Sequence, residues 1–425
     1  MRPGNILHEH EFGAAEVGYL SADMWHLSMN AGRSSVARIL LTGATGFLGG
    51  AVLHQALSRR DGTEWVCLVR CASAEQGRQR IAARLSRFTD PFTAQRLARA
   101  VEVVPGDFTR ADLDADPRLD SCTHVLHLAA DTSWWGEERV SRTNHDGTLA
   151  LARRARGMPG LVRFLHVSTA MICGAEAPSL VEEADYPSRD ARHLVAYTVS
   201  KAAAETSLAG SFADLPIVVA RPSIVVGHST LGAAPSSSIL WVIRAADRLR
   251  LVPCAAESAV DIVPVDWVAE SLVGLLRKPT LAHTLYHISA GAGARSRWDD
   301  LMQAFAAADP AGGPRDDFSR FDLAADRALL RRRFAETFGL DGSMKQAMLR
   351  AVRAYYAFCS LDLTFSNERL LAEGLAPPPA FTDYLKVCLE NAPEIAEQFA
   401  DDLEMFVAPD PAQGPAPVLP LTASA

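Results

Sequence analysis

The sequence lacks the features that mark a secreted or membrane-spanning protein. Its seven cysteines are scattered and odd in number, and none form a C-x-x-C pair, a usage typical of reduced, mostly buried thiols in a cytoplasmic protein. No apolar run reaches the ~20 residues that a membrane-spanning helix needs. Residues 1–30 also lack the apolar core of a signal peptide. We therefore expect a cytoplasmic protein with no transmembrane segment.

Positively charged residues are also fewer than negatively charged ones. The chain has 42 Lys and Arg against 50 Asp and Glu, a net charge of −8, which argues against nucleic acid as the main partner. His8 and His10 stand close together in the leader, but two histidines in a polar stretch do not make a metal site, so no metal is expected. The 48% of hydrophobic residues over 425 positions suffice for a full globular core.

The most informative segment is a glycine-rich stretch at residues 39–50. An apolar, strand-like run leads into a turn and then an apolar helical pattern, the order of a dinucleotide-binding βαβ unit. Gly43 permits the tight turn, Gly46 lets the backbone approach a pyrophosphate, and Gly49 lets the helix sit close to its strand. The free N–H groups at the helix start then face the phosphates. The loop residues expected to bind the cofactor are Gly43, Thr45, Gly46, Phe47 and Leu48.

From residue 37 onwards, short apolar runs alternate with amphipathic stretches, which favours a parallel sheet covered by helices. Strands are expected at 38–42, 65–69, 101–104, 124–128, 162–167, 217–220 and 284–288, and helices at 47–58, 74–87, 138–156, 196–209 and 265–276. We predict an α/β fold: a doubly wound Rossmann-type parallel sheet with a smaller, mostly helical C-terminal substrate region. The expected parts are an N-terminal extension (1–36), a nucleotide-binding domain with substrate-binding insertions (37–290), the helical region (291–407) and a disordered, proline-rich tail (408–425).

Tyr197 and Lys201 lie four residues apart on a strong helical pattern, so both project from one face. An ammonium beside a phenol stabilises the phenolate and lowers the pKa of the tyrosine from about 10 toward neutrality, which gives a proton donor beside a nicotinamide. The same spacing also suits a core tyrosine and a solvated lysine. Ser168 and Thr169 supply hydroxyls at the end of a predicted strand, where α/β sheets place their ligands. This joint occurrence favours the catalytic interpretation.

Together with the glycine loop, these residues resemble an extended short-chain dehydrogenase/reductase. The segments that carry the resemblance are Thr42–Gly49, His127–Asp131, Ser168–Thr169, Tyr197–Lys201 and Arg221–Ser223. Within that superfamily, the thioester reductase and fatty acyl-CoA reductase branch, of the male-sterility type, is most similar in Gly46–Gly49, Cys67–Arg70, Gly106–Phe108 and Val263–Asp266. The likeness covers residues 37–290, and residues 363–371 resemble a short F-x-N stretch of acyl-CoA reductases.

The resemblance implies roles for individual residues. Thr169, Tyr197 and Lys201 would form the catalytic set, with Ser168 as the structural neighbour and fallback hydroxyl, and Asn144 would brace the backbone near the active site. The cofactor would be contacted by Tyr197 and Lys201, by Asp107 and Phe108 at the adenine, by Ala129 and Ala130 beneath the nicotinamide, and by Pro222 and Ser223 beside its carboxamide.

The choice of cofactor follows from the charge after the second predicted strand. NAD-preferring sites usually place an Asp or Glu there to bind the ribose hydroxyls, whereas this strand ends at Arg70 and meets no acid until Glu75. Because a guanidinium suits a 2′-phosphate, the predicted cofactor is NADPH. Arg80 and Arg84, on the helical pattern that follows, fit a phosphate or a solvated basic face equally well, and Arg80 is included in the predicted site.

Two further features of the sequence can each be interpreted in two ways. Trp134 and Trp135 suit either an acyl or aryl channel or packing at its rim. The basic runs at 244–250 and 331–333 suit either a docking surface for an acidic carrier protein or coenzyme A, or a solvated helix face.

For each of the remaining reactive side chains we favour one interpretation. Cys173 lies near the catalytic strand, but hydride reduction of a thioester needs no covalent enzyme intermediate, so we do not expect it to act as a nucleophile. His124, His127 and His166 are strand residues and are expected in the core with satisfied hydrogen bonds.

The sequence thus predicts an NADPH-dependent oxidoreductase that reduces an acyl thioester to the aldehyde, with the alcohol as the product of a second hydride. The acyl group must arrive activated, on coenzyme A or on an acyl carrier protein. One alternative is another extended short-chain reductase or epimerase acting on a ketone, an aldehyde or another small molecule, and the helical region after residue 290 speaks against it. A non-catalytic NADPH-binding regulator is the other, and the presence of Thr169, Tyr197 and Lys201 speaks against that.

Overall fold

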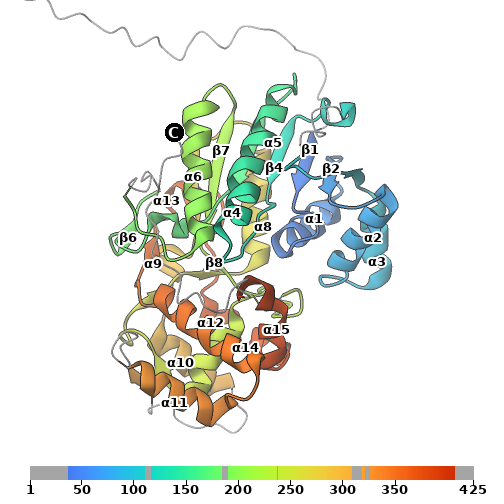
Figure 1. The fold of residues 1–425 in the computed structure, drawn as a ribbon. Coiled ribbons are helices and arrows are strands. Elements are labelled where there is room, and N and C mark those ends of the chain that lie inside the picture. The colour runs from blue at the N-terminus through green and yellow to red at the C-terminus, as the bar shows by residue number, and fades with distance from the viewer. Residues whose placement is uncertain are drawn as a thin grey trace, which may run out of the picture. The chain divides into compact units, whose positions relative to one another are not determined.

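A seven-stranded parallel sheet forms the centre of the computed structural model (Figure 1). Its strand order is β12-β7-β5-β4-β1-β2-β3, and every neighbouring pair is parallel. The strands are β1 (Arg38–Thr42), β2 (Glu64–Val69), β3 (Glu102–Pro105), β4 (His124–His127), β5 (Arg163–Val167), β7 (Ile217–Pro222) and β12 (Leu285–Ile288). These are the seven strands expected from the sequence. The predicted doubly wound Rossmann-type sheet is therefore confirmed.

The structure describes residues 37–110, 116–183, 190–236, 238–308, 318–320 and 326–406, with side chains as far as residue 400. All of them belong to one unit of the chain, 37–425. The predicted extension at 1–36, with His8 and His10, and the predicted tail at 408–425 lie outside the described residues.

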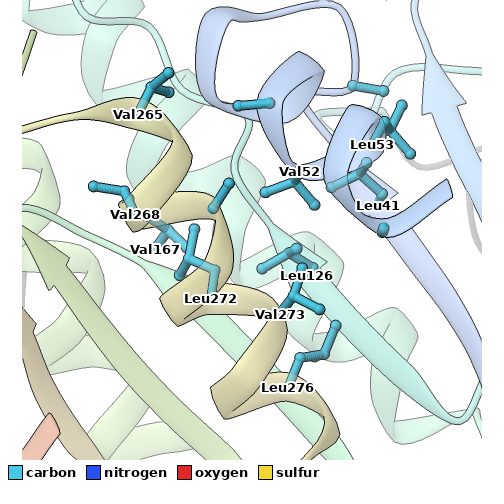
Figure 2. Close-up of a cluster of buried hydrophobic side chains, with 14 of the residues drawn as sticks. Leu41, Val52, Leu53, Leu126, Val167, Val265, Val268, Leu272, Val273 and Leu276 are labelled. Atoms are coloured by element: carbon cyan, nitrogen blue, oxygen red, sulfur yellow. The ribbon is translucent and has the colours of Figure 1, made fainter. Parts of the chain in front are cut away.

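Helices cover both faces of the sheet. One face packs against α1 (Phe47–Arg59), α2 (Ala74–Leu85), α3 (Pro91–Arg99) and α8 (Val265–Arg277), and the other against α5 (Gly147–Arg156) and α6 (Ala196–Ser211), with α4 (Glu137–Ser141) beside α6. Figure 2 shows the first layer, where Val268 and Leu272 of α8 lie beside Val167 of β5, and Val273 of α8 lies beside Leu126 of β4. Each such side chain contributes about 1.5–3 kcal/mol when it is fully buried. Helix α3 was not expected from the sequence.

A second core lies among the helices that follow the sheet in the chain. They are α10 (Trp298–Ala308), α11 (Arg327–Phe338), α12 (Ser343–Cys359), α14 (Phe381–Glu390) and α15 (Ile395–Phe406), joined by α7 (Leu240–Leu249). Trp241, Trp298 and Tyr356 are fully buried there. The expected helical character of the C-terminal region is confirmed. Since α7 comes from within residues 37–290, the two predicted parts share this core.

Among the described residues, four pairs of two-residue strands and two further short helices lie outside the seven-stranded sheet. The pairs are β6 (Leu180–Val181) with β15 (Thr364–Phe365), β8 (Ile224–Val225) with β11 (Ile262–Val263), β9 (Leu251–Val252) with β14 (Ser319–Arg320), and β10 (Ala259–Val260) with β13 (Ser296–Arg297). The helices are α9 (Gly291–Ala294) and α13 (Glu368–Ala372). Strands this short leave no periodicity in a sequence, which is why none of them was expected.

Three properties bear on the class of protein. The seven cysteines all lie in the described ranges and are free thiols. Within those ranges, none of the helices combines the length and the hydropathy needed to cross a bilayer. The described residues also contain no cluster of three or more His, Cys, Asp or Glu side chains arranged to hold a metal ion.

Candidate active site

The predicted site residues gather at one edge of the sheet. Strands β1, β4, β5 and β7 are neighbours, and Gly43, Ala129, Ser168 and Ser223 follow their carboxyl ends. The chain leaves β1 toward β2 and β3 and returns to β4 on the other side, so the strand order reverses between β1 and β4. Open α/β sheets bind ligands in the crevice outside such a reversal. The structure thus brings together residues that are far apart in the sequence.

The glycine loop has the geometry that the sequence predicted at two positions. Gly43 has a φ of +81°, and a Cβ there would lie 2.8 Å from the nitrogen of Ala129. A Cβ on Gly49 would lie 2.1 Å from the carbonyl oxygen of Gly43. Gly46 closes the turn by donating its N–H to the Gly43 oxygen at 2.9 Å. Helix α1 then begins with no side-chain cap and no acid in its first turn, so its N–H groups fit a pyrophosphate.

The rest of the loop is held from behind by an arginine. The Arg84 Nε donates to the Thr45 carbonyl oxygen at 3.0 Å, and its aliphatic stem packs over Gly50. Burial lowers the pKa of this guanidinium. Phe47 and Leu48 are half-buried against the core, which leaves their backbone N–H groups for a ligand. Arg84 is therefore a brace of the phosphate loop, a role that neither interpretation of the sequence included.

The end of β2 carries the predicted 2′-phosphate ligands. Arg70 is exposed directly after the strand, and the Arg80 guanidinium donates to the Arg70 carbonyl oxygen, which holds the Arg80 side chain at the backbone of Arg70. Arg78 instead pairs with Glu75 at 3.2 Å on the surface of α2. Two guanidinium groups without an adjacent acid at the strand end fit a phosphate better than a pair of ribose hydroxyls.

The residues predicted at the adenine follow β3. One carboxylate oxygen of Asp107 accepts hydrogen bonds from the backbone N–H and the hydroxyl of Thr109, at 3.0 and 2.8 Å. The Phe108 ring is buried and lies edge-on to His127, with 5.2 Å between ring centroids. The ring of Phe108 therefore belongs to the core, and the predicted contact of this segment with adenine falls to its backbone and to Asp107.

Lys201 projects from α6 to the end of β5, and Tyr197 lies one turn earlier on the same helix, packed against the core of the helical region. The Lys201 Nζ is buried and donates to the Val167 carbonyl oxygen at 2.8 Å, and burial lowers its pKa to about 8. Tyr197 is half-buried, and its hydroxyl has no hydrogen-bond partner among the described residues. Burial raises the pKa of Tyr197 to about 12, contrary to the expected lowering by Lys201. The physical reason is that a buried phenolate loses hydration while the ammonium is bonded to a carbonyl, so the phenol stays protonated and is a hydrogen-bond donor.

Two hydroxyls stand at the end of β5. Thr169 precedes the short turn Ala170–Cys173; its Oγ1 accepts from the Met171 N–H at 3.3 Å and donates to the Pro222 carbonyl oxygen at 3.5 Å. The Ser168 Oγ is buried and has no partner within the described ranges. Both hydroxyls retain capacity for a ligand, so the choice of Thr169 stays a prediction. Burial raises the pKa of the Cys173 thiol to about 12, which leaves no thiolate for nucleophilic attack at neutral pH.

Asn144 joins the turn after β4 to the helix that carries Tyr197. It is fully buried in the π-helical turn Arg142–Asp146, a distortion frequent at functional sites. Its Oδ1 accepts from the Asp131 N–H at 2.7 Å, and its Nδ2 donates to the Asp131 carbonyl at 2.8 Å and to the Ser200 Oγ at 2.9 Å. Ser200 in turn donates to the Tyr197 carbonyl at 2.8 Å. The predicted bracing role of Asn144 is confirmed.

A buried histidine continues this network to the glycine loop. The Thr148 hydroxyl donates to the Asn144 carbonyl at 2.6 Å, so it accepts from the Nε2–H of His127 at 2.9 Å. The His127 Nδ1 then accepts from the Thr42 hydroxyl at 2.7 Å, and Thr42 accepts from the Ala129 N–H at 3.1 Å. Burial lowers the pKa of His127 to about 3, which keeps it neutral. The prediction that His127 is hydrogen-bonded in the core is confirmed. The sequence did not reveal that His127, through Thr42, holds the backbone of Ala129, which is predicted to lie beneath the nicotinamide.

The structure supports some of the other predictions from the sequence and contradicts one of them. The His166 ring is buried, but neither ring nitrogen has a partner among the described residues, so its expected hydrogen bonding is wrong. His124 is bonded through its Nδ1 to the Thr123 hydroxyl at 2.9 Å. Trp134 packs against Tyr355 of α12, with 4.4 Å between ring centroids, which favours the packing interpretation. Trp135 is half-buried against the same core.

The sequence also gave no sign of an ion pair beneath the site. Arg221 at the end of β7 donates to both carboxylate oxygens of Glu205 on α6, at 2.6–3.1 Å, and both side chains are almost fully buried. Removing one partner of such a pair leaves an uncompensated buried charge. The pair therefore fixes α6 against β7, one turn after Lys201 on the same helix.

Known proteins share both the sequence and the fold of this region. Residues 41–272, more than half of the chain, match the family described as male sterility protein. Fatty acyl-CoA reductase 1 of Xenopus laevis is 28% identical over 276 residues, covering 55% of this chain and 53% of that protein. The isonitrile lipopeptide synthase of Streptomyces coeruleorubidus is 30% identical over 260 residues, covering 59% of this chain and 17% of that protein. The aligned part thus spans about half or less of these relatives.

A solved structure extends the likeness of fold beyond the sequence match. The terminal R domain from the myxalamid PKS-NRPS biosynthetic pathway superimposes with a TM-score of 0.66 at 21% identity, over 84% of this chain and 90% of that one. The resemblance seen in the sequence is therefore confirmed. This chain belongs to the male sterility protein family, the branch of NAD(P)-binding extended short-chain dehydrogenase/reductases that contains thioester reductases and fatty acyl-CoA reductases.

Proposed function

We propose that this protein uses NADPH to reduce an acyl thioester to an aldehyde. The observation that supports the proposal is the Lys201–Val167 hydrogen bond at the carboxyl end of β5, where Thr169 follows the strand and Tyr197 lies one turn earlier on the same helix as Lys201. The relatives support a thioester as substrate, because they include a fatty acyl-CoA reductase and synthases whose names indicate assembly-line chemistry.

The side chains have complementary tasks in this reaction. When bound, NADPH supplies a hydride to the carbonyl carbon. Tyr197, protonated at neutral pH because its pKa is raised, and Thr169 donate hydrogen bonds to the carbonyl oxygen as negative charge develops there. Tyr197 delivers a proton to that oxygen, and Lys201 holds the ribose in place. The C–S bond of the resulting hemithioacetal then breaks, the sulfur takes up the hydroxyl proton, and thiol and aldehyde are released.

NADPH, rather than NADH, is proposed from the charge at the end of β2. Arg70 and Arg80 lie together there, and the nearest acid, Glu75, is occupied by Arg78. A 2′-phosphate can take charge-assisted hydrogen bonds from both guanidinium groups, whereas a ribose diol gains little from them.

The acyl group is proposed to arrive on coenzyme A or on an acyl carrier protein. Arg331, Arg332 and Arg333 are exposed on α11, which supports a surface that attracts an acidic carrier or the phosphates of coenzyme A. We also propose a cytoplasmic location, which the seven free cysteines support.

One experiment separates this function from its alternatives. NADPH oxidation is followed with acyl-CoA, acyl-carrier, aldehyde, ketone and nucleotide-sugar substrates. Turnover of a thioester with release of free thiol supports the proposal. Turnover of a ketone or a nucleotide sugar alone points to another extended short-chain reductase or epimerase, and tight NADPH binding without any turnover points to a regulator.

A further inference from the structure

Asp261 is a buried carboxylate that the catalytic proposal does not use. It lies between β10 and β11 with only 3% of its surface exposed. Its Oδ1 accepts from the Ala290 N–H at 2.7 Å, and its Oδ2 accepts from the Phe365 N–H at 3.3 Å. No Lys or Arg pairs with it among the described residues. Burial raises its pKa to about 6, so at neutral pH the group is still mostly ionised. The hydrogen bonds given above come from backbone N–H groups.

These contacts join three segments that are distant in the sequence. Ala290 follows the end of β12, and Phe365 lies in β15 of the C-terminal region. The Asp261 carbonyl oxygen accepts from the N–H of Ile224, in β8 directly after β7. Only a carboxylate can accept on both oxygens, because an amide would turn an NH₂ group toward one of the two N–H donors. The residue type is therefore specific to this arrangement.

A second layer of contacts closes around the carboxylate. The Asn367 Nδ2 donates to the Ser289 carbonyl at 2.8 Å, and the Ser289 hydroxyl donates to the Phe365 carbonyl at 2.9 Å. Gly291 has a φ of +64°, and a Cβ there would lie 2.4 Å from the Asn367 Oδ1. Phe365 and Asn367 are the two residues of the F-x-N stretch. These hydrogen bonds hold the F-x-N stretch against the end of β12. We call Asp261, Phe365 and Asn367 together the latch.

The latch lies directly behind the segment predicted to flank the nicotinamide. The Ser223 N–H donates to the Ile288 carbonyl oxygen at 3.1 Å, which pairs the end of β7 with the end of β12. The Ser223 hydroxyl is close enough to Asp261 to lower the pKa of that carboxyl, although its geometry falls outside that of a formed hydrogen bond. Asp261 therefore binds Ile224, the residue directly after the Pro222–Ser223 segment, through its own carbonyl and borders Ser223 through its carboxylate.

We propose that Asp261 is a positioning residue for the nicotinamide half of the cofactor, because its carboxylate fixes the ends of β12 and β15 against the Pro222–Ser223 segment. The inference rests on the proposed cofactor site. It gives the C-terminal region a task at the cofactor, in addition to its predicted role in binding substrate. The adenosine half binds at the glycine loop and at the end of β2, on the far side of β4 and β5, so it does not depend on this latch.

The test uses Asp261→Asn in the full chain, and Glu373→Gln as the matched control. Like Asp261, Glu373 has a carboxylate that accepts from a backbone N–H, here that of Ala282 at 2.8 Å. It also accepts from the Tyr286 hydroxyl at 2.5 Å. It acts at the opposite, amino end of β12. Each variant is titrated with NADPH and with adenosine 2′,5′-bisphosphate, which has the adenosine half alone, and its thermal unfolding is recorded.

We expect Asp261→Asn to weaken NADPH binding about tenfold or more, the effect of losing a charged hydrogen-bond acceptor, and to change bisphosphate binding by less than about twofold. Glu373→Gln should leave both affinities unchanged even where it lowers thermal stability. Equal weakening of both ligands by Asp261→Asn, or no change in either, overturns the inference. If Asp261→Asn does not fold, Asn367→Ala must show the same difference between the two ligands.

The two proposals fail in different ways. A wild-type protein that binds neither NADPH nor NADH removes the proposed function itself. A wild-type protein that binds NADPH, with an Asp261→Asn variant that binds it equally well, removes only the positioning role.

Discussion

The Lys201 ammonium donates a hydrogen bond to the carbonyl oxygen of Val167, with 2.8 Å between nitrogen and oxygen. This contact fixes α6 to the end of β5, the strand that Ser168 and Thr169 follow. Because the lysine is buried, its pKa is lowered to about 8. The charge of this group is therefore close to titrating in the physiological range, which makes it open to measurement.

Activity is expected to fall as the pH rises through about 8, since a neutral Lys201 holds the ribose less strongly than the ammonium does. The sign for stability is opposite. Between the folded pKa of about 8 and the ordinary value of 10.5, the unfolded chain binds the extra proton, so the contribution of this group to the free energy of unfolding rises with pH. A profile of kcat/KM from pH 6 to 10, paired with thermal unfolding, separates the two. A flat profile through this window would contradict the assignment.

The two neighbouring hydroxyls offer a matched pair. Thr169→Val keeps the shape and removes the hydroxyl predicted to bind the carbonyl oxygen, and we expect kcat to fall about 100-fold, the usual effect of losing one such donor. Ser168→Ala removes a buried hydroxyl without a partner in the described residues and should have a much smaller effect. If Ser168→Ala is the more damaging change, the fallback assignment from the sequence is the right one.

Cofactor preference should depend on Arg70. Arg70→Ala is expected to weaken NADPH binding about tenfold or more, because a charge-assisted hydrogen bond to the 2′-phosphate is lost, and to leave NADH binding unchanged. Arg78→Ala is the control, since Arg78 lies on α2, the helix that follows Arg70, but pairs with Glu75. Fluorescence titrations with both nucleotides measure the ratio. Equal losses for NADPH and NADH would show that Arg70 does not read the phosphate.

Two helical glycines should respond in opposite directions to alanine. In Gly49→Ala the new Cβ would lie 2.1 Å from the Gly43 oxygen, so the helix must move and the free energy of unfolding should fall by about 3 kcal/mol. Gly210 in α6 has nothing within 4 Å of a Cβ, so Gly210→Ala should raise it by about 0.5–1 kcal/mol. Denaturant unfolding measures both. A tolerated Gly49→Ala would mean that the close approach of loop and helix is not required.

The sheet could be predicted because each of its strands is a short apolar run of its own. The glycine pattern and the Tyr197–Lys201 spacing were visible for the same reason, since both are local. Helix α3 was missed: it has only nine residues, and Phe92 on its first turn is 79% exposed, so its pattern does not point to a buried face.

What the sequence could not supply are contacts between distant segments. The Glu205–Arg221 pair, the His127 network and the Asp261 latch each join residues that become neighbours only once the strands are ordered. The raised pKa of Tyr197 has the same origin. The local spacing predicted that a nearby ammonium lowers the pKa of Tyr197. Burial depends on the layers packed around the residue, and here its effect on that pKa is larger than the effect of the ammonium.

The most direct measurement follows the hydride itself. The protein is incubated with NADPH carrying deuterium at C4 of the nicotinamide and with a panel of acyl-CoA and acyl-carrier thioesters, and the products are analysed by mass spectrometry. The account predicts an aldehyde with one deuterium on its former carbonyl carbon, or an alcohol with two, equimolar free thiol, and loss of both products in Tyr197→Phe. Absence of labelled product with every thioester, or undiminished labelling in Tyr197→Phe, would contradict it.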